Sequence, residues 1–368
     1  MARVLKPDTE ADVADAIREA EKAQSPLAIE GGGTKRHLGR VVDTQTILKL
    51  SGLAGITMYE PDEMVFTARA GTSPAEIEAT LAAKGQCLAF EPASAEGATI
   101  GGVVAANASG PRRFAAGAAR DHLLGFSAVD GQGERFKAGG RVVKNVTGYD
   151  LPKLAAGSFG TLFVMTELTL RAVPRGATAV LAIEDLPPAK ALHLLRRIAG
   201  SPFDPTGLAY IATRELVLIR LEGRPDGVAA RRDELCRTLA KGARVLAADE
   251  GANLFKSLTD VRPLFGNATE LWRLSLPPTQ CEEAVKQLAP ETWVADWAGG
   301  LLWLEEPSGS VHATARALGG HATLFRHRVP RDDVFPPLDA ATEVLTRRLK
   351  QTFDPARILN RGRMYKDI

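Results

Sequence analysis

Cysteine is scarce in this sequence. The 368 residues include three cysteines, Cys87, Cys236 and Cys281, which lie far apart and form no C-x-x-C pair. A chain without paired cysteines carries no iron–sulfur cluster of its own and no zinc site built on thiolates. Sparse, unpaired cysteines are typical of a reducing compartment, so we expect a cytoplasmic protein.

Long hydrophobic runs are also missing. The apolar runs reach only about ten residues, roughly half the length that a membrane-spanning helix needs. Residues 1–8 contain no apolar segment of the kind found in secretory signal peptides. We therefore expect neither a membrane span nor a signal peptide in this sequence, and membrane contact would be peripheral, through a partner.

Neither sign of charge is in large excess. Lysine and arginine together number 46 and aspartate and glutamate 44, which gives a net charge of +2. This balance argues against a large nucleic-acid-binding surface. A hydrophobic fraction of 45% and a charged fraction of 24% are ordinary for a globular protein. The length predicts two domains or three.

Several familiar catalytic signatures do not occur. There is no G-K-[ST], which excludes a Walker loop, and no G-x-S-x-G, since position 156 is alanine, which excludes a hydrolase nucleophile elbow. The histidines have no metal-ligand spacing, so we expect no metal site. These histidines are His37, His122, His193, His312, His321 and His327.

Two loops rich in glycine and other small residues stand out instead. Residues 31–36 read G-G-G-T-K-R, and residues 98–110 read A-T-I-G-G-V-V-A-A-N-A-S-G. Glycine lets backbone N–H groups point into one concavity, so two such loops that meet in the fold would make a slot for a diphosphate. A plain tight turn at the first loop and a close helix–sheet crossing at the second are the alternatives.

Local patterns place these loops among short elements. Residues 9–23 and 73–84 begin with capping residues and predict helices, the second with proline at its first position. Apolar residues at 26–30 predict a strand directly before the first loop. Further short strands are expected at 43–49, 56–61 and 64–71.

Taken together, the motifs of the first half resemble the vanillyl-alcohol oxidase (PCMH-type) FAD-binding family. The similarity rests on the order of the two loops, on A-R-D-H-L-L-G with D-G at 130–131, on V-K-N-V-T-G-Y-D-L and on G-S-F-G-T. The ending F-D-P-A-R-I-L-N at 353–360 matches as well. Within the family, the chain is most similar to the FAD-binding subunits of glycolate oxidase-type complexes, through G-R-V-V-K-N-V-T-G-Y-D at 140–150 and G-R-M-Y at 362–365.

This resemblance implies a non-covalent FAD held between two α+β subdomains. The diphosphate would lie on the loops at 31–35 and 99–102, and the isoalloxazine near residues 92, 94, 107–110 and 164. The cofactor-binding residues implied in this way are Gly31, Gly32, Gly33, Thr34, Lys35, Pro92, Ser94, Thr99, Ile100, Gly101, Gly102, Asn107, Ala108, Ser109, Gly110, Tyr149, Gly160 and Val164.

The sequence departs from the family pattern in a few places. Phe163 stands where the family has glycine, so a bulky ring is expected beside the cofactor strand, where it would weaken binding if it pointed into the channel. Arg361 stands where proline usually follows Asn360. His37 and His122 lie outside the position at which some members bond the flavin covalently, which is why we expect non-covalent FAD.

The middle of the chain has a different pattern of predicted strands and helices. Two successive rounds of strand, helix, hairpin and helix, over 180–239 and 271–327, predict a ferredoxin-like α+β cap. We expect an FAD-binding domain at 1–175, the cap at 176–330, and a return at 331–368 that includes an amphipathic helix over 332–350. Four tryptophans fall in the cap, either in its core or on a partner-binding face.

The resemblance implies one function and leaves two alternatives. We expect the FAD-binding subunit of a glycolate oxidase-type complex, working with a larger catalytic flavin subunit and an iron–sulfur subunit on a small 2-hydroxy acid. A self-sufficient FAD-dependent 2-hydroxy acid dehydrogenase is the first alternative, with Arg326 or Arg328 binding the substrate carboxylate unless both belong to a solvated strand edge. A non-catalytic scaffold with an empty flavin site is the second.

Overall fold

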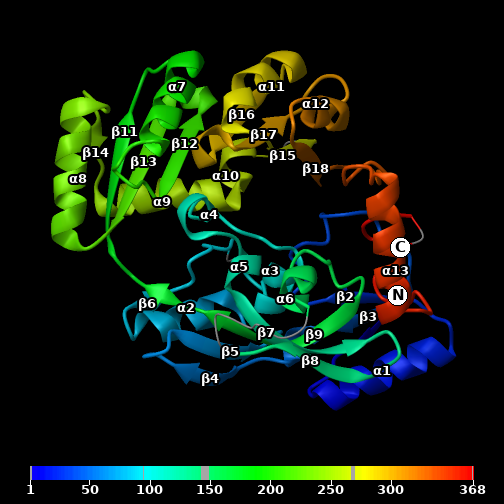
Figure 1. Cartoon of the computed structure of the whole chain (residues 1–368). Coiled ribbons are helices and arrows are strands. Elements are labelled where there is room, and N and C mark those ends of the chain that lie inside the picture. The colour runs from blue at the N-terminus through cyan, green and yellow to red at the C-terminus, as the bar shows by residue number, and fades with distance from the viewer. Residues whose placement is uncertain (1, 94, 142–148, 267–269, 367) are drawn as a thin grey trace.

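The structure is a computed structural model that describes residues 2–93, 95–141, 149–266, 270–366 and 368. Its lower half contains sheets of three and five strands and a two-stranded pair, and its upper half contains one large sheet with helices on both faces (Figure 1). The chain passes from the lower to the upper half once, near residue 175, and returns once, after residue 326.

The first sheet is parallel and carries the first glycine loop. Its strands have the order β1–β3–β2, and α1 begins with a capping box in which Thr9 accepts from the Asp12 N–H group. Val13 and Ile17 of α1 are fully buried, as the sequence pattern predicts. The bounds are β1 Arg3–Leu5, α1 Glu10–Lys22, β2 Leu27–Glu30 and β3 Thr46–Lys49.

The second sheet is antiparallel and carries the second loop beside it. Its five strands have the order β4–β5–β9–β7–β8, and the hairpin β7–β8 falls where the R-D-H-L-L-G motif predicts it. The strands are β4 Ile56–Glu60, β5 Val65–Arg69, β7 Leu123–Asp130, β8 Arg135–Gly139 and β9 Phe163–Arg171, with a small pair β6 Gln86–Cys87 and β10 Val173–Pro174. The helices are α2 Pro74–Ala82, α3 Ile100–Ala105, α4 Arg113–Ala116, α5 Ala119–His122 and α6 Leu151–Ala155.

The upper half confirms the predicted repetition. One antiparallel sheet has the order β14–β11–β13–β12–β16–β17–β15–β18, so each half of it has the ferredoxin-like order 4–1–3–2, and the two halves meet where β12 pairs with β16. The strands are β11 Ala177–Ile183, β12 Gly207–Ile211, β13 Leu216–Gly223, β14 Arg244–Val245, β15 Leu271–Ser275, β16 Thr292–Asp296, β17 Leu301–Glu305 and β18 His321–Arg326. The covering helices are α7 Pro188–Ala199, α8 Pro225–Thr238, α11 Cys281–Leu288 and α12 Val311–Ala317.

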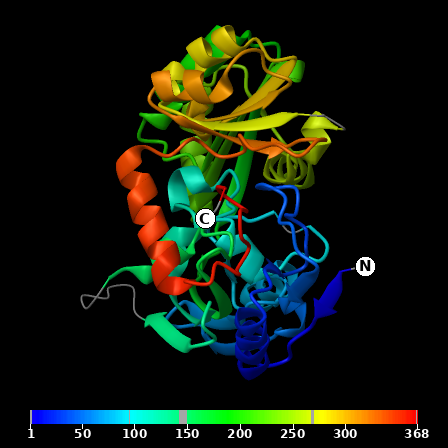
Figure 2. The same ribbon diagram turned by 90° about the vertical axis from the view of Figure 1, so that its right-hand side faces the viewer.

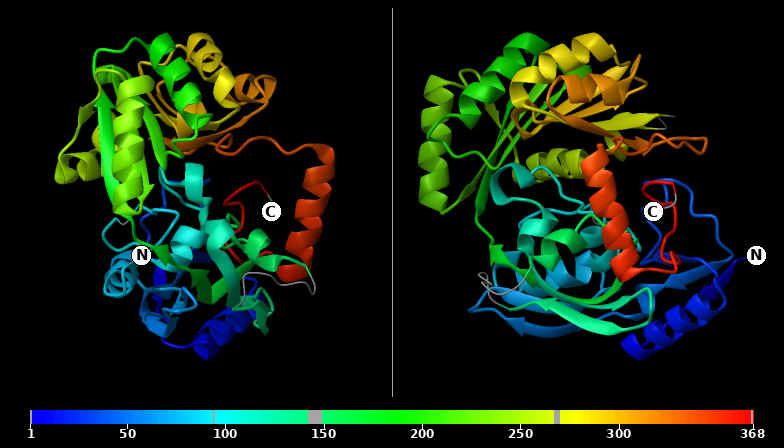
Figure 3. Two further views of the ribbon diagram at one scale, coloured as in Figure 1. Left: turned by 60° about the vertical axis from the view of Figure 1, so that its left-hand side comes forward. Right: turned by 45° about the vertical axis from the view of Figure 1, so that its right-hand side comes forward.

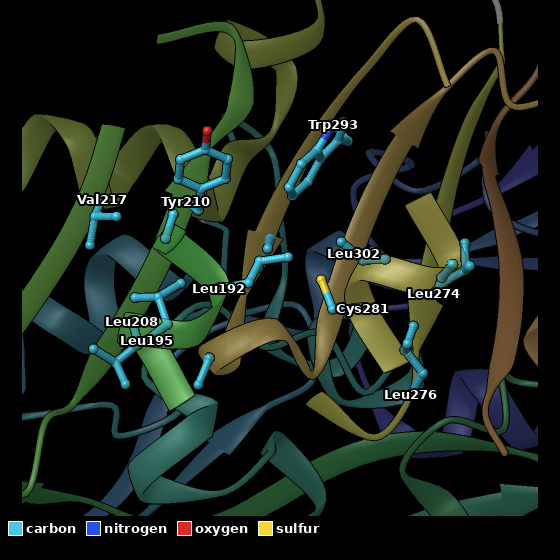
Figure 4. Close-up of a cluster of buried hydrophobic side chains, with 14 of the residues drawn as sticks. Leu192, Leu195, Leu208, Tyr210, Val217, Leu274, Leu276, Cys281, Trp293 and Leu302 are labelled. Carbon is cyan, nitrogen blue, oxygen red and sulfur yellow. The ribbon is translucent and has the colours of Figure 1, made fainter. Parts of the chain in front are cut away.

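A continuous apolar core fills the space between this sheet and its covering helices. Leu192 and Leu195 of α7 lie over Leu208 and Tyr210, while Cys281 of α11 lies near Leu274 and Leu302 (Figure 4). The core continues across the β12–β16 seam, so the two halves share one hydrophobic cluster and stabilise each other.

The four tryptophans are buried in this upper half. Trp272 and Trp293 belong to the cluster under the covering helices, and Trp297 and Trp303 belong to a second cluster on the opposite face of the sheet. Their exposed fractions range from 2% to 8%. They are therefore core residues, and none of them offers the exposed aromatic face that a partner would bind.

The face of the large sheet that looks toward the lower half is covered by two helices that were not predicted. They are α9 Ala248–Asp260 and α10 Arg262–Phe265. Gly251 lets α9 approach the sheet closely, because a Cβ at this position would lie 2.8 Å from the Val180 side chain. Phe255 and Leu258 of α9 complete the second apolar cluster.

The expected helix over 332–350 is wrong at its start. The helix is α13 Ala340–Phe353, and Asp339 caps it by accepting from the Thr342 N–H group. Pro336 and Pro337 lack backbone donors and disfavour the helical conformation of the residue before them, so the helix begins after them. Figure 2 shows α13 standing beside both halves of the molecule. The domain limits 1–175, 176–330 and 331–368 stay a prediction.

Among the residues that the structure describes, none of the helices combines the length and the apolar character needed to cross a bilayer.

Candidate functional site

The two glycine loops lie against each other. A Cβ on Gly31 would overlap the Thr99 hydroxyl, and a Cβ on Gly32 would overlap the carbonyl oxygen of Gly97. Neither glycine has a positive φ, so close approach rather than backbone conformation requires glycine here. Thr99 also caps α3, because its hydroxyl accepts from the Gly102 N–H group at 3.3 Å.

Two adjoining cavities open along this contact. They share Ile29, Gly31, Thr99, Gly102 and Phe159 as walls. One extends over the rest of the first loop to the C-terminal tail, and the other reaches Gly160 and Val164 at the start of β9. The cavity walls therefore combine small residues, backbone groups and a few cations, which is the composition that a diphosphate requires.

Two cationic side chains at this cavity are poorly compensated. Lys35 has no side-chain hydrogen bond or ion pair among the described residues, and burial lowers the pKa of its ammonium group. Arg363 donates from Nη2 to the Lys35 carbonyl oxygen at 2.8 Å, but its buried Nε has no acceptor. The neighbouring carboxylate of Glu30 is engaged by Arg36, at 2.7 Å from Nε. An anion in the cavity would satisfy both Lys35 and Arg363.

The structure brings one part of the implied cofactor set together. Ile100 lies among these residues in the sequence, but its side chain points into the apolar core and is fully buried. Ser94 lies outside the described residues. The implied residues that line the two cavities are Gly31, Gly32, Gly33, Thr34, Lys35, Thr99, Gly101, Gly102, Gly160 and Val164.

Apart from Val164, the described residues implied for the isoalloxazine end do not line these two cavities. Asn107 and Ser109 use their side-chain oxygens to accept from the N–H groups of Arg120 and Ala119, at 3.1 Å each, and so hold the start of α5. Gly110 packs on the Glu91 backbone and on Thr259 of α9.

Three more residues of the implied cofactor set, Pro92, Ala108 and Tyr149, also lie outside the two cavities of the glycine loops. Pro92 lines two cavities between the halves of the molecule, and Ala108 packs against the apolar core. The Tyr149 side chain is 94% exposed and points into solvent.

Phe163 lines one of the two cavities, but its ring packs into the apolar core. The ring stacks on Phe126 with centroids 5.2 Å apart and meets Phe136 and Phe353 edge to face. Its side chain is 1% exposed. The bulky residue in the family's glycine position therefore contributes an aromatic core contact below the cofactor strand.

A second candidate region lies where α4 meets the large sheet. The guanidinium carbon of Arg113 is 4.8 Å from the Trp297 ring centroid, and that of Arg273, on β15, is 5.2 Å from the same ring. Arg273 also faces Trp303 at 5.9 Å. Among the described residues, neither guanidinium donates a hydrogen bond to an acceptor or pairs with a carboxylate. Burial and the neighbouring Arg113 lower the pKa of Arg273 to about 10, so it stays charged at neutral pH.

Trp297 adds a third donor without an acceptor. Its indole Nε1 is buried and unpartnered, and its backbone φ of 52° is unusual for a bulky residue. We call Arg113, Arg273, Trp297 and Trp303 the arginine–tryptophan cluster. Arg113, Arg273 and Trp297 present only donors, and an anion such as a carboxylate is the group that would satisfy them.

Asp296, directly before Trp297, makes a pH-dependent contribution to stability. It is 2% exposed, and burial raises its pKa to about 7, although Arg220 and Arg273 lie near enough to oppose this. In the unfolded chain this carboxyl ionises near its ordinary pKa of 3.8. The folded state thus binds an extra proton between pH 4 and 7, so stability is full below about pH 4 and is lost as the pH rises to about 7.

We therefore expect Asp296→Asn to be more stable than the wild type at pH 8, by up to about 4 kcal/mol, and close to it at pH 4. Urea unfolding at both pH values measures the difference. Asp249→Asn, on an exposed residue, is the control. An equal effect of Asp296→Asn at the two pH values would contradict the assignment.

Ion pairs hold the two halves of the molecule together. Arg220 of β13 donates to Glu91 at 2.7 and 3.0 Å, and Arg112 donates to Glu222 at 2.6 and 3.0 Å. Glu91, Arg112 and Glu222 line two cavities of about 880 and 530 Å³, and Arg220 lines the second. Because each arginine here has its carboxylate, this group differs from the arginine–tryptophan cluster, whose cations are unpaired.

The arginines that the sequence singled out lie elsewhere. Arg326 ends β18 and donates to the Gly266 carbonyl oxygen at 2.9 Å, and Arg328 is exposed beyond the end of that strand. The structure therefore does not align them on one strand face. The His37 ring packs edge to face on Phe325, with ring centroids 5.3 Å apart. His122 is buried, and its Nε2 lies 2.8 Å from the Ala116 carbonyl oxygen.

Comparison with known proteins gives three results. Residues 1–139 match a family model described as an FAD binding domain. The chain is 36% identical over 357 residues to the glycolate oxidase subunit GlcE of Escherichia coli (strain K12), covering 96% of each protein. It is 32% identical over 173 residues to a D-lactate dehydrogenase of Archaeoglobus fulgidus, covering 47% of this chain and 39% of that protein.

The solved structure of an alkyldihydroxyacetonephosphate synthase has the same fold. Its TM-score is 0.71 at 18% identity, over 97% of this chain and 75% of that one.

Proposed function

Because this chain belongs to the FAD-linked oxidoreductase family that contains the glycolate oxidase subunit GlcE, we propose that it is the FAD-binding subunit of a complex that oxidises a small 2-hydroxy acid, glycolate, to glyoxylate. The observation that carries the proposal is the cavity between the two glycine loops, where the partly buried Lys35 has no side-chain partner among the described residues. Residues 31–35, Thr99 and Gly102 would hold the diphosphate of FAD. When bound, FAD supplies the acceptor for the hydride that leaves the substrate carbon.

Partners follow from the same relationship. The names GlcE and GlcD of the relatives denote subunits, and we propose that this chain joins a larger catalytic flavin subunit and an iron–sulfur subunit. Since the sequence has no paired cysteines, an iron–sulfur cluster would have to come from a partner. We place the complex in the cytoplasm, with membrane contact through partners.

The test is the flavin spectrum of the purified chain. We expect a yellow protein with about one FAD per chain whose flavin is reduced by glycolate only when the partner subunits are present. A colourless, folded protein that ignores added FAD would refute the proposal. Rapid bleaching by glycolate or D-lactate without a partner would instead favour the self-sufficient enzyme.

The arginine–tryptophan cluster is the observation that favours this second candidate. A substrate carboxylate would pair with Arg113 and Arg273 and accept from the Trp297 indole, so the cap and the FAD-binding half would both contribute to one anion site. This replaces the earlier hypothesis that Arg326 or Arg328 plays the role.

We expect Arg273→Ala to weaken glycolate and D-lactate binding by roughly 10- to 100-fold, which corresponds to losing a charge-assisted hydrogen bond. Titration of tryptophan fluorescence reports binding, because Trp297 and Trp303 adjoin the guanidinium. Arg328→Ala, in an exposed position, is the control. If only Arg328→Ala weakened binding, the carboxylate site would lie at the end of β18 instead.

The structure does not support the reason for considering a non-catalytic scaffold with an empty flavin site. It rested on Phe163 obstructing the flavin, and the Phe163 ring packs against Phe126, Phe136 and Phe353 in the core.

A further inference from the structure

The C-terminal tail runs along the strand that leads into the first glycine loop. After α13, the Leu27 N–H group donates to the Ile358 carbonyl oxygen at 2.7 Å, and the Asn360 N–H group donates to that of Leu27 at 3.0 Å. Leu359 and Leu27 form a parallel bridge. The tail thus adds a short strand beside β2, which Figure 3 shows as the red segment near the blue one.

The Asn360 side chain sets the direction of the tail through two hydrogen bonds. Its Oδ1 accepts from the Ile29 N–H group at 2.8 Å, and its Nδ2 donates to the Phe159 carbonyl oxygen at 2.7 Å. Both Ile29 and Phe159 are walls of the cavities described above. The residues that follow Asn360 are therefore directed at the first glycine loop.

The path of the tail brings Arg363 to the cavity between the two glycine loops. Arg363 lines the same cavity as Lys35, and its Nη2 donates to the Lys35 carbonyl oxygen at 2.8 Å. Its Nε is buried without an acceptor, and Lys35 has no side-chain partner among the described residues. Glu30, the nearby acid, is already bound by both Nε and Nη2 of Arg36. Two cations from opposite ends of the chain thus face a space in which Glu30, paired with Arg36, is the one acid among the described walls.

We propose that the tail is the third wall of the cofactor site, in which Arg363 and Lys35 bind the diphosphate of a flavin or adenine nucleotide. The proposal rests on the proposed function, and it adds that the cofactor anchors the tail. An uncompensated guanidinium in a partly closed cavity gains both a counter-charge and its missing acceptor when a diphosphate binds.

The tail also reaches the segment that returns from the cap. The Arg40 N–H group donates to the Arg363 carbonyl oxygen at 2.8 Å, and the Arg40 guanidinium forms an ion pair with Asp332. The Tyr365 hydroxyl donates to the Pro336 carbonyl oxygen at 3.2 Å. A ligand that holds Arg363 therefore also orders the connection between the two halves of the molecule.

Binding of three probes to the full chain tests the diphosphate contact. FAD and ADP both carry the diphosphate, whereas riboflavin carries none. We expect Arg363→Gln, which keeps a donor for the Lys35 carbonyl but removes the charge, to weaken FAD and ADP roughly 10- to 100-fold and to leave riboflavin unchanged. Arg361→Gln, at an exposed position two residues earlier, should alter all three by less than about twofold.

Hydrogen exchange gives the readout for the anchored tail. Saturating ADP should slow exchange in peptides covering 354–366 and 332–337 of the wild type, and should do so much less in Arg363→Gln. Equal affinity of Arg363→Gln and the wild type for both FAD and ADP would overturn the inference while leaving the proposed function intact. A wild type that binds neither nucleotide would overturn both. A parallel loss of riboflavin binding would show a general collapse of the site and would also count against the specific role.

Discussion

Gly32→Ala is expected to weaken FAD binding by roughly 100-fold or more while leaving the rest of the fold intact. Gly32 does not have a positive φ, so its φ is not what requires glycine. The added methyl group, however, would overlap the carbonyl oxygen of Gly97, which is backbone and cannot rotate away. The two loops must then separate, and the groups of both loops that line the cavity move apart. Fluorescence titration with FAD measures the affinity, and circular dichroism checks the fold.

Gly227→Ala is the matched control. No atom lies within 4 Å of the Cβ that it would add, and Gly227 lies inside α8. Alanine is the better helix former by about 1 kcal/mol, so this variant should be slightly more stable and bind FAD normally. Normal FAD affinity in Gly32→Ala would mean that the contact between the loops does not shape the cofactor site.

Lys350→Met is expected to destabilise the protein by about 3–5 kcal/mol, a large part of the 5–15 kcal/mol that folded domains usually possess. Lys350 is 1% exposed. Its Nζ donates to the carbonyl oxygens of Thr161 and Leu359, at 2.7 and 2.9 Å, and to Asp354 at 2.7 Å. Methionine fills similar volume but leaves the buried Asp354 carboxylate without its cation. Urea unfolding measures the loss.

Two further variants make this result specific. Arg348→Met changes an exposed cation on the same helix and should have little effect. Lys350→Met combined with Asp354→Asn removes the uncompensated charge and should recover part of the stability, since the two residues are coupled. If Lys350→Met were as stable as the wild type, the buried pair would contribute nothing to holding α13 and the tail.

Elements defined by local signals could be predicted from the sequence. Thr9 and Ser73 cap α1 and α2 where their side chains can reach the first free N–H groups. The pattern of apolar residues also predicted the two successive rounds of strands and helices in the cap. These signals act within a few residues, so no tertiary information was needed.

The errors arose where local signals were ambiguous. α9 was not expected because Gly251 lowers helix propensity in its first turns, and only the packing against Val180 explains that glycine. The helix expected from 332 had a suitable apolar pattern, but the consecutive prolines at 336 and 337 override periodicity, and Asp339 provides the actual cap.

The candidate site could be predicted only in part, because it is assembled from distant segments. The glycine loops were recognisable since each is a local cluster. Arg363 lies 328 residues from its partner Lys35, and Arg113 and Arg273 meet only through the ring of Trp297. An arginine without a nearby acid has no sequence signature, since its missing partner can be recognised only after folding.

The strand that Ile358 to Asn360 add beside β2 has a consequence for biosynthesis. Asn360 satisfies the backbone of Ile29, a residue made 331 positions earlier, so the edge of the first sheet stays incomplete while the ribosome synthesises nearly all of the chain. The cap, whose strands pair only with one another, has its whole sequence available sooner and is able to fold first. The proposed nucleotide site therefore gains Arg363 only after both glycine loops and the whole cap have been synthesised.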